Sequence, residues 1–376
     1  MVKVLHINSN YLTSKLHENL LDNLKKKGIK STVFMPIKFQ TKDNILYESK
    51  HEVYNPVSFH DFDKYIFTWK QNKIYRKLHH YINVNEYNMT HAHTLFTDGN
   101  VAYQLKKKFG IPYIVTVRGD TDIENFFKKR INLRNRGRKI LENAFKVVFI
   151  SEKNRDKLLN KYVNTESLKL QIFKKSTVIP NGIDSYYLEN EGIPKNIDSL
   201  KSLKFIQVGK LIERKNGLGS LKGIKEYIKN TENCAELIFV GDIIDKRYVN
   251  RIKKEGKGIV SFYPSIKPEK LIELYREADI FIMPSFTETF GLVYPEAMSQ
   301  GLPVLYTKGQ GFDGQYPEGY VGYSVSANDP KIIAEKIECI VNKYPILSQN
   351  ALEAHKRFNW SELAQQYVNI YKNCSF

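Results

Sequence analysis

Short apolar runs alternate with amphipathic segments along the whole chain. In the first half, apolar runs predict strands over Val2–Ile7, Ser31–Met35, Pro112–Val117 and Val147–Ile150. Apolar residues at helical spacing predict helices over Ser14–Lys27, Asp98–Phe109 and Leu133–Ala144. The region Gln40–Lys70 has weak periodicity and many aromatic residues, so we expect it to be irregular. Strand and helix patterns in alternation predict an α/β fold with a parallel sheet and crossover helices.

A second alternation of the same kind begins after Val178–Asp184, where Pro180 and the pair Asn181-Gly182 predict a turn. It predicts strands over Phe205–Val208, Leu237–Val240, Ile259–Phe262, Ile280–Met283 and Pro303–Tyr306. The helices expected around them include Pro268–Glu277, Lys331–Asn342 and Trp360–Tyr371. A chain of 376 residues is long for one core and fits two domains.

The most informative stretch follows the predicted strand Ile280–Met283. From Pro284 to Met298 it reads Pro-Ser-Phe-Thr-Glu-Thr-Phe-Gly-Leu-Val-Tyr-Pro-Glu-Ala-Met, and a short helix is expected to open within it. Ligands of parallel α/β sheets bind at such junctions between a strand and the next helix. Amide groups at the start of the helix can bind a phosphate, and carboxylates on either side can accept hydrogen bonds from hydroxyl groups. The amides are those of Gly291, Leu292 and Val293, and the carboxylates are Glu288 and Glu296.

This stretch resembles the E-x7-E segment of retaining glycosyltransferases of family 4. The resemblance depends on the full string of Ser285, Glu288, Phe290, Gly291, Glu296 and Gly301. In that family the first Glu holds the donor sugar and the second holds the ribose, which implies these roles for Glu288 and Glu296. Phe290 and Gly291–Val293 would then belong to the donor-binding site. The resemblance implies a retaining hexosyltransferase that uses a nucleotide diphosphate sugar, most plausibly a UDP-sugar, as its donor.

The same resemblance implies the GT-B architecture, in which two Rossmann-like domains face each other across a cleft. The N-terminal, acceptor-binding domain would span residues 1–178, and a C-terminal helix at about 359–376 would cross back to it. The donor-binding domain would span residues 179–358. Phe358-Asn359-Trp360 is similar to the family's C-terminal signature. The expected acceptor is a hydroxyl group of a glycan or a lipid-linked sugar, as in the synthesis of cell-surface polysaccharides.

A second loop with phosphate-binding chemistry follows the strand Phe205–Val208. Gly209 permits a close approach of the backbone, and Lys210 and Lys215 can reach the same diphosphate. The loop resembles the family's Gly-Arg-Leu…Lys-Gly segment, whose Arg and Lys neutralise the leaving diphosphate. Here Lys210 takes the Arg position and Asn216 the second Gly position. A lysine is a point charge and lacks the two-pronged geometry of arginine, so we expect Lys215 to matter more than Lys210.

Two further glycine-containing loops follow predicted strands of this half. Gly241 ends the strand Leu237–Val240 and is expected to border the nucleoside. Gly309-Gln310-Gly311 follows Pro303–Tyr306, where it could wrap the donor or simply form a turn.

The first half departs from the family pattern at two places. Arg118 ends the strand Pro112–Val117 where most of the family has a histidine, and an arginine cannot act as a base near neutral pH. We expect Arg118 to hold an anion or a sugar hydroxyl instead. The family's mechanism is usually drawn as front-face attack assisted by the departing phosphate, so a protein base is not strictly required. The family's glycine-rich loop after the first strand is replaced by Asn8-Ser9-Asn10-Tyr11. His91 and His93 point the same way on a strand, but no Cys or carboxylate accompanies them at ligand spacing, so a structural role is favoured over a metal site.

Positive charge is concentrated in the first half. Residues 1–175 contain 33 Lys and Arg against 16 Asp and Glu, whereas residues 176–376 contain 25 against 24. Such a field attracts anionic partners and membrane surfaces, so we expect an anionic acceptor and peripheral contact with an anionic membrane. The dense basic segment Lys128–Lys139 could dock such a surface or could be a solvated helix face. A nucleic-acid or polyanion-binding protein is the alternative, although no nucleic-acid motif is present.

The remaining features narrow the class of protein further. No apolar run is long enough to span a membrane, and the N-terminus lacks the layout of a signal peptide. Three scattered cysteines indicate neither a disulfide framework nor a metal site, which fits a reducing cytoplasm or the inner face of its membrane. No metal or other cofactor is expected. A sugar-nucleotide epimerase of the same fold is a further alternative, against which the E-x7-E string argues.

Overall fold

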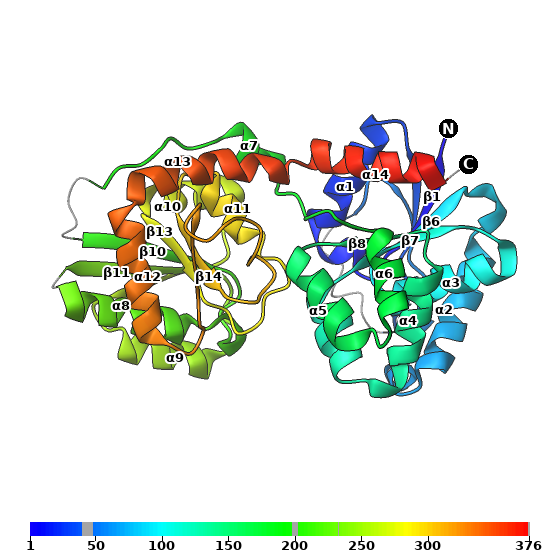
Figure 1. The fold of residues 1–376 in the computed structure, drawn as a ribbon, viewed down its shortest axis with the longest axis horizontal. Helices are drawn as coiled ribbons and strands as arrows, with labels where there is room; N and C mark the ends of the chain where they lie inside the picture. The colour runs from blue at the N-terminus through cyan, green and yellow to red at the C-terminus, as the bar shows by residue number, and fades with distance from the viewer. Residues whose placement is uncertain (40–47, 198–201, 232, 375–376) are drawn as a thin grey trace. The chain divides into compact units, whose positions relative to one another are not determined.

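The computed structural model describes residues 1–39, 48–197, 202–231 and 233–374 and divides the chain into two compact units (Figure 1). Unit 1 comprises Met1–Gly182 and Trp360–Phe376, and unit 2 comprises Ile183–Asn359. The boundaries expected from the sequence, after residues 178 and 358, lie a few residues before these. The α/β class is confirmed, because each unit contains a parallel sheet flanked by helices.

Unit 1 is built on a parallel sheet whose described strands run in the order β4-β2-β1-β6-β7-β8-β9. These strands are β1 (Lys3–Ile7), β2 (Lys30–Phe34), β4 (Glu52–Tyr54), β6 (Met89–Ala92), β7 (Tyr113–Val117), β8 (Lys146–Phe149) and β9 (Ser176–Val178). A separate short pair is formed by β3 (Ile37–Lys38) and β5 (Val57–Phe59). The central strands are buried on both faces, which explains why their sequences are continuous apolar runs.

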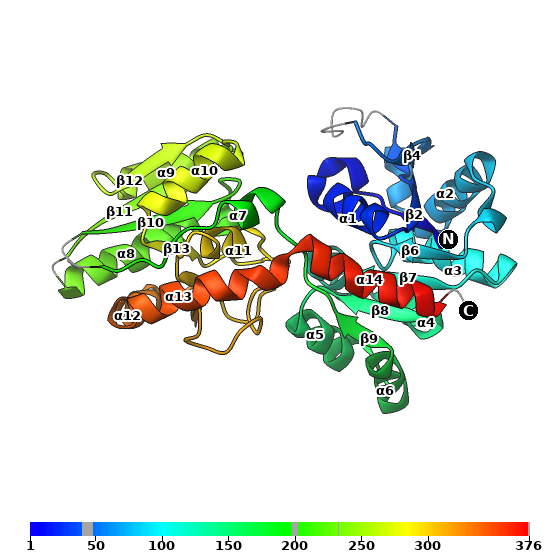
Figure 2. The same ribbon diagram turned by 90° about the horizontal axis from the view of Figure 1, so that it is seen from above.

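Helices cover both faces of this sheet (Figure 2). One face packs against α1 (Lys15–Lys26) and the C-terminal helix α14 (Trp360–Cys374), which share an apolar cluster with Val4, Ile114 and Val148. The opposite face is covered by α2 (Phe67–Tyr81), α3 (Thr97–Phe109) and α4 (Arg134–Asn143). The remaining elements are α5 (Glu152–Tyr162), α6 (Glu166–Lys174), a π-helical segment Gly119–Lys128 and the short 3-10 turns Tyr11–Thr13, Asp61–Lys64, Val84–Glu86 and Ile131–Leu133.

Unit 2 contains a parallel sheet with described strands in the order β12-β11-β10-β13-β14-β15. They are β10 (Ser202–Val208), β11 (Cys234–Val240), β12 (Val260–Tyr263), β13 (Ile280–Met283), β14 (Val304–Thr307) and β15 (Gly322–Val325). The helices are α7 (Ser185–Glu189), α8 (Gly217–Thr231), α9 (Lys246–Glu255), α10 (Pro268–Glu277), α11 (Val293–Met298), α12 (Pro330–Asn342) and α13 (Tyr344–Ala354). Short 3-10 turns cover Glu213–Lys215 and His355–Phe358.

The strands and helices predicted from apolar periodicity are present, and most bounds agree within a few residues. The expectation of an irregular Gln40–Lys70 is wrong from residue 48 onward, where β4, β5 and the start of α2 lie; residues 40–47 are outside the described part. β4 and β5 have only three residues each, too few to show a period, and the exposed Phe62, Tyr65 and Trp69 interrupt the apolar pattern around the start of α2. Across the described ranges, every helix is too short or too polar to span a bilayer.

Candidate active site

The predicted donor residues of unit 2 lie where the parallel strands end at their carboxyl edge. The loop after β10 carries Gly209, Lys210 and Lys215, and the loop after β13 carries Glu288. β10 and β13 are neighbours in the sheet, so their two loops start side by side. Sequence order alone separates Lys215 from Glu288 by more than seventy residues, and the sheet topology brings them together.

Lys215 and Glu288 form the central ion pair of this site. The Lys215 Nζ donates to Glu288 Oε2 at 2.5 Å, and only 15% and 10% of the two side chains are exposed. The second carboxylate oxygen of Glu288 accepts a hydrogen bond from the Thr289 amide at 3.1 Å. A lysine ammonium has three donor hydrogens, so Lys215 can contact an anionic ligand while it still holds Glu288.

The Lys215 loop is fixed by side chains that were not singled out from the sequence. Gln207 Nε2 donates to the Lys215 carbonyl at 2.8 Å, and the Gln207 Oε1 atom accepts from Ser220 at 2.7 Å. Arg214 donates from Nη1 to the Thr287 carbonyl at 2.7 Å, which connects this loop to the residue before Glu288. Gln207 lies in β10, Arg214 in the 3-10 turn Glu213–Lys215 and Ser220 on α8, and they form no contiguous motif, so the sequence offers little that would identify them.

Asn216 shows how the chain replaces the family's second glycine. Its backbone is left-handed, with φ of 53°, a conformation that asparagine tolerates better than most residues. Its side-chain Nδ2 donates to the carbonyls of Pro284 (2.9 Å) and Ala327 (2.7 Å), and Oδ1 accepts from the Gly219 amide at 3.1 Å. The asparagine therefore keeps the turn and adds a connection to the strand end that precedes Glu288.

Gly209 and Gly241 have backbone conformations that favour glycine, with φ of 137° and 146°. A Cβ at Gly241 would lie 2.2 Å from the Gly209 carbonyl oxygen, and the Gly209 amide donates to the Val240 carbonyl at 2.8 Å. The close approach at Gly241 is therefore between two loops of the protein. Lys210, next to Gly209, has an exposed side chain at the edge of the site.

The loop from Gly309 to Gly311 packs directly on the Glu288 segment. The Gly311 amide donates to the Glu288 carbonyl at 3.1 Å, and a Cβ at Gly311 would lie 1.9 Å from the Thr289 carbonyl oxygen. Gln310 accepts a hydrogen bond from the Glu288 amide through Oε1 at 2.9 Å. This loop therefore orients Glu288.

The residues between the two glutamates include a buried aromatic side chain and backbone amides that face no acceptor in the described chain. The Phe290 side chain is buried against Phe358, with ring centroids 5.7 Å apart, so only its backbone could face a donor. Gly291 has φ of 81° and lies beside the ring of Tyr294. The amides of Gly291 and Leu292, just before α11, have no hydrogen-bond acceptor among the described residues. Leu292 and Val293 are partly exposed, so the predicted phosphate contacts are sterically open.

Glu296 lies in the second half of the E-x7-E string, on α11, and its side chain is partly exposed. Loss of solvent, with a smaller contribution from Asp184, raises the pKa of Glu296 to about 7. The carboxyl is therefore near its titration midpoint at neutral pH. In its charged form it accepts hydrogen bonds, which is the chemistry expected for contact with ribose hydroxyls.

Arg118 follows β7 in unit 1 and is held by protein groups. Its Nε donates to the His93 carbonyl at 3.2 Å, its Nη1 donates to Asn181 Oδ1 at 3.1 Å, and its amide donates to Asp122 at 2.7 Å. A guanidinium has five donor hydrogens, so these contacts leave others for an anion or hydroxyl. Burial lowers the pKa of Arg118, but an arginine still keeps its charge at neutral pH.

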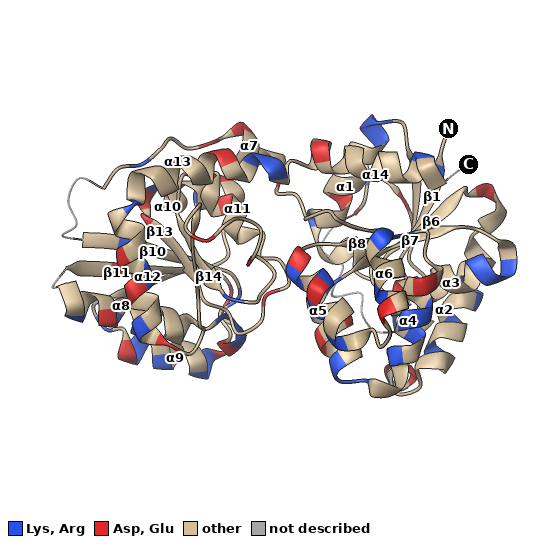
Figure 3. Cartoon of the chain, viewed as in Figure 1, with Lys and Arg blue, Asp and Glu red and all other residues tan. Residues whose placement is uncertain are grey.

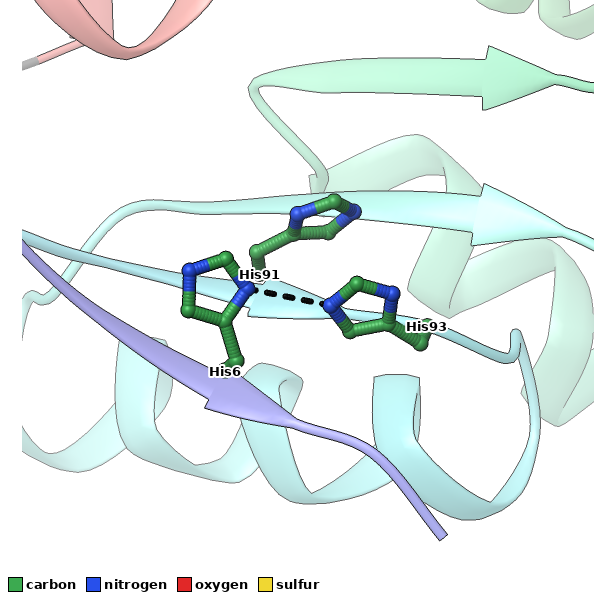
Figure 4. Close-up of side chains that lie close together, drawn as sticks. All are labelled: His6, His91 and His93. Atoms are coloured by element: carbon green, nitrogen blue, oxygen red, sulfur yellow. Dashed lines mark hydrogen bonds between the residues drawn. The ribbon is translucent and has the colours of Figure 1, made fainter. Parts of the chain in front are cut away.

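His6, His91 and His93 form a buried cluster in unit 1 (Figure 4), and the His93 carbonyl is the one that accepts from Arg118. His6 and His91 are paired in register on β1 and β6, and His93 Nε2 lies 3.0 Å from His6 Nδ1. The second nitrogen of His6 lies 3.1 Å from Ser31 Oγ. His91 is hydrogen-bonded to the Tyr371 hydroxyl at 2.7 Å and to Thr116 Oγ1 at 2.9 Å.

The ligand atoms of His6, His91 and His93 lie within 4.8 Å of one another, close enough for a metal ion. Both nitrogens of His6 and of His91 already have hydrogen-bond partners, which a metal would have to displace. Burial lowers the pKa of His6 to about 3 and those of His17, His91 and His93 well below the ordinary value, so the cluster is neutral. The hydrogen bonds support the structural role that we predicted for one of the pair His91 and His93.

A cavity of about 310 Å³ lies within unit 1, next to the loop after β1. Its lining is rich in hydroxyl groups and includes two cations: Ser9, Thr13, Thr94, Thr97, Thr121, Lys38 and Lys70. Ser9 donates to the buried carboxylate of Asp98 through its hydroxyl and through its amide at 3.2 Å. Side chains thus shape this loop where the family has glycines. The cavity could accommodate a sugar-sized ligand.

Comparisons with known proteins identify the family and the fold of the chain. The family model described as Glycosyltransferase Family 4 matches residues 16–186, and the model described as Glycosyl transferases group 1 matches residues 190–358. The two models together span most of the chain, which belongs to glycosyltransferase family 4. Its fold is GT-B: sucrose-phosphate synthase of Thermosynechococcus elongatus aligns with a TM-score of 0.76 at 19% identity over 99% of both chains. Anabaena HepE in complex with UDP aligns with a TM-score of 0.71 at 17% identity over 99% of this chain and 100% of HepE.

Relatives found by sequence carry the same class of activity in their names. An uncharacterised glycosyltransferase of Methanocaldococcus jannaschii is 25% identical over 76% of each chain. The D-inositol 3-phosphate glycosyltransferase of Corynebacterium efficiens is 31% identical, but the match covers 31% of this chain and 28% of that protein. The protein is therefore a glycosyltransferase, and the shorter match is too limited to transfer a substrate.

Proposed function

We propose that the protein transfers a hexose, with retention of anomeric configuration, from a nucleotide diphosphate sugar to a hydroxyl group of a glycan or lipid-linked acceptor. The observation that carries the proposal is the largely buried Lys215–Glu288 pair at the carboxyl ends of β10 and β13. In the proposal, the ammonium of this pair neutralises a diphosphate and its carboxylate accepts hydrogen bonds from sugar hydroxyls. A UDP-sugar is the favoured donor, since the structurally similar HepE was solved with UDP and with UDP-glucose.

In the proposed reaction, the acceptor hydroxyl adds to the anomeric carbon as the bond from that carbon to the diphosphate breaks. The hydroxyl proton passes to the departing phosphate on the same face of the sugar, so no protein base is required. Lys215, with Lys210 at the edge of the site, neutralises the charge that develops on the leaving group. Glu288 holds the donor sugar and Glu296 the ribose, while Arg118 orients an anionic group or a hydroxyl. The proposed reaction uses no metal.

An anionic acceptor is proposed from the charge of unit 1. Figure 3 shows lysines and arginines over several of its helices, including α2 and α4. The hydroxyl-lined cavity next to Ser9 includes Lys70, whose pKa is lowered by burial and whose Nζ lies 4.0 Å over the Phe59 ring. A phosphate or carboxylate on the acceptor would compensate such a partly buried cation. A lipid-linked sugar at the inner face of a membrane presents an anionic group on an anionic surface, and both attract the cations of unit 1. We propose that the protein acts there in a polysaccharide or glycoconjugate pathway.

The test is a screen of UDP-, GDP- and ADP-sugars for slow hydrolysis, with the anomer of the released product determined by NMR. We expect one UDP-sugar to be hydrolysed with retention, and UDP at millimolar concentration to raise the melting temperature. Release of the inverted anomer would refute the retaining mechanism. Stabilisation by oligonucleotides and none by nucleoside diphosphates would instead favour a nucleic-acid-binding protein.

A further inference from the structure

We propose that the outer face of α2 and the turn before it form the membrane-docking surface, with aromatic and aliphatic side chains inserted into an anionic bilayer. This inference deepens the membrane contact of the proposed function and does not depend on the donor chemistry. Four large apolar side chains in this segment are exposed: Phe62 (84%), Tyr65 (76%), Ile66 (64%) and Trp69 (59%). We refer to these four residues as the apolar tip.

The apolar tip is local in sequence and spans the entry into α2. Phe62 belongs to a 3-10 turn, Tyr65 and the extended residue Ile66 connect that turn to α2, and Trp69 lies in the first turn of α2. The 3-10 turn Asp61–Lys64 leads into α2, and the Lys70 amide donates to the Ile66 carbonyl at 3.1 Å. The core side of α2 is formed instead by Ile74, Tyr75 and Leu78. The core therefore uses one side of α2, whereas Trp69 and the three apolar residues before the helix are exposed to solvent.

Two lysines, an arginine and a histidine continue the outer side of α2 beyond Trp69. Lys73, Arg76, Lys77 and His80 follow Trp69 at helical spacing and line a hollow of about 640 Å³ together with His60. Arg76 and Lys77 are exposed, whereas Lys73 is paired with Asp63 at 2.8 Å. A hollow lined by cations next to exposed aromatic residues is suited to the phosphate groups of lipids whose chains receive the aromatic residues.

The distance along α2 from the apolar tip to the cations matches the depth between the acyl-chain boundary and the lipid phosphates. Arg76 lies seven positions after Trp69, which corresponds to roughly 10 Å along a helix. Side chains of interfacial helices enter the boundary between headgroups and acyl chains by roughly 5–10 Å. The proposal therefore has α2 inclined to the bilayer with the apolar tip entering first, which leaves Arg76 and Lys77 near the level of the lipid phosphates, where each adds attraction for anionic lipid.

A neighbouring segment of unit 1 extends this surface. Phe126 lies 6.1 Å from Phe67 at the start of α2, and the Arg130 guanidinium lies 4.9 Å from the Phe126 ring. Ile131 is 68% exposed. The basic triplet singled out in the sequence is partly neutralised, since Lys128 pairs with Glu124 at 3.1 Å and Lys129 contacts Asn125 at 3.0 Å. We therefore assign the main anionic contact to Arg76 and Lys77 and a supporting one to Arg130.

The chain contains its own reporter for this proposal. It has two tryptophans: Trp69 belongs to the apolar tip, and Trp360 is 6% exposed in the core of unit 1. The experiment adds phosphatidylcholine vesicles, with or without phosphatidylglycerol, to the full-length protein at low salt. We expect a blue shift of the emission and quenching by brominated lipids with the anionic vesicles, and loss of both in Trp69→Phe.

Binding is then measured by vesicle sedimentation with matched variants. The double variant Phe62→Ser/Ile66→Ser retains Trp69 and should weaken binding about tenfold or more, since each insertion removes a large apolar side chain from water. The control is Leu170→Ser/Ile346→Ser, whose side chains are 58% and 61% exposed elsewhere, and it should bind normally.

The charge contribution is tested in the same way. Arg76→Glu/Lys77→Glu should weaken binding to anionic vesicles by about tenfold or more at low salt and should not affect binding to neutral vesicles. Lys253→Glu/Lys254→Glu on α9 is the matched control, because both of its lysines are exposed in unit 2.

Three outcomes would overturn the proposal. The first is an unchanged Trp69 emission when anionic vesicles are added. The second is concentration-dependent dimerisation that Phe62→Ser/Ile66→Ser abolishes, which would assign the apolar tip to a second copy of the chain. The third is binding of inorganic phosphate without any vesicle binding. UDP-induced stabilisation, measured in parallel, tests the transferase proposal separately.

Discussion

The two units differ in how their chemistry is encoded. In unit 2 the central residues lie in two short strings, each directly after a strand, and the sheet brings Lys215 and Glu288 to 2.5 Å. In unit 1 the polar groups come from many separate elements: Ser9 follows β1, Lys70 lies on α2, and Arg118 follows β7. A contiguous motif suits the recognition of a ligand that stays the same from one transferase to the next, such as a diphosphate sugar. Recognition of a variable acceptor fits a scattered set of side chains on the same scaffold.

The units also differ in how they use buried titratable groups. Unit 1 contains four buried histidines whose pKa values are lowered by burial, at positions 6, 17, 91 and 93. In unit 2 the sole histidine is His355, whose ring lies 3.1 Å from Glu191. The comparison therefore predicts that acid destabilises unit 1 more than unit 2.

The largest expected effect is this acid sensitivity. Groups with a lowered folded pKa bind protons more readily in the unfolded chain, so their contribution to stability is lost as pH falls below about 6.5. Asp98 and Asp122, with pKa values raised to about 6 and about 7, act in the opposite direction. Because the four histidines outnumber these two carboxyls, the free energy of unfolding should fall as the pH decreases below about 6.5.

Tryptophan fluorescence measures this effect selectively, because Trp69 and Trp360 both lie in unit 1. The urea midpoint of the fluorescence transition should fall from pH 7 to pH 5, and the pH dependence should weaken in His93→Asn. His80→Asn is the control, since His80 is exposed on α2. A midpoint that does not change with pH would show that the histidine cluster accepts protons without cost.

The next largest effect concerns Glu288. Glu288→Ala should reduce transfer by about 10- to 150-fold, because hydrogen bonds to a charged group contribute roughly 1.5–3 kcal/mol. The reduction should fall mainly on kcat if those bonds tighten in the transition state. Glu335→Ala, at an exposed position of α12, is the control, and both variants should melt like the wild type. Turnover near the wild-type rate in Glu288→Ala would remove the basis of the proposed donor site.

Much of the fold and of the donor site could be predicted from the sequence, for physical reasons. Buried parallel strands are continuous apolar runs, and ligand loops follow their carboxyl ends, so Ile280–Met283 and Glu288 could be placed together. The helix α2 could not be predicted, because its exposed aromatic residues disrupt the apolar periodicity. The role of His6 was also hidden, since its pairing with His91 arises from strand register between distant segments.

Arg118 provides a test on the side of unit 1. Arg118→Ala should lower transfer by roughly tenfold or more through loss of a charged hydrogen bond, and Arg118→Lys should retain part of the activity. Neither variant should change UDP-induced stabilisation, because Arg118 belongs to unit 1. Asn181→Ala removes one of the partners that orient Arg118 and should have a smaller effect in the same direction. Full transfer by Arg118→Ala would show that the guanidinium serves only to connect β7 to the chain after β9.

The smallest expected difference separates the two lysines of the donor loop. Lys215 is mostly buried beside Glu288, whereas the Lys210 side chain is exposed, so solvent screens the charge of Lys210 more strongly. Lys215→Ala should weaken UDP binding about tenfold and UMP binding much less, which corresponds to about 1.4 kcal/mol on the terminal phosphate. Lys210→Ala should change UDP binding only a few-fold, within the range of about 0.2–1 kcal/mol measured for exposed ion pairs. Isothermal titration calorimetry with both nucleotides measures these differences, and Lys222→Ala on α8 is the exposed control. Equal weakening of UDP and UMP in Lys215→Ala would place this lysine away from the terminal phosphate.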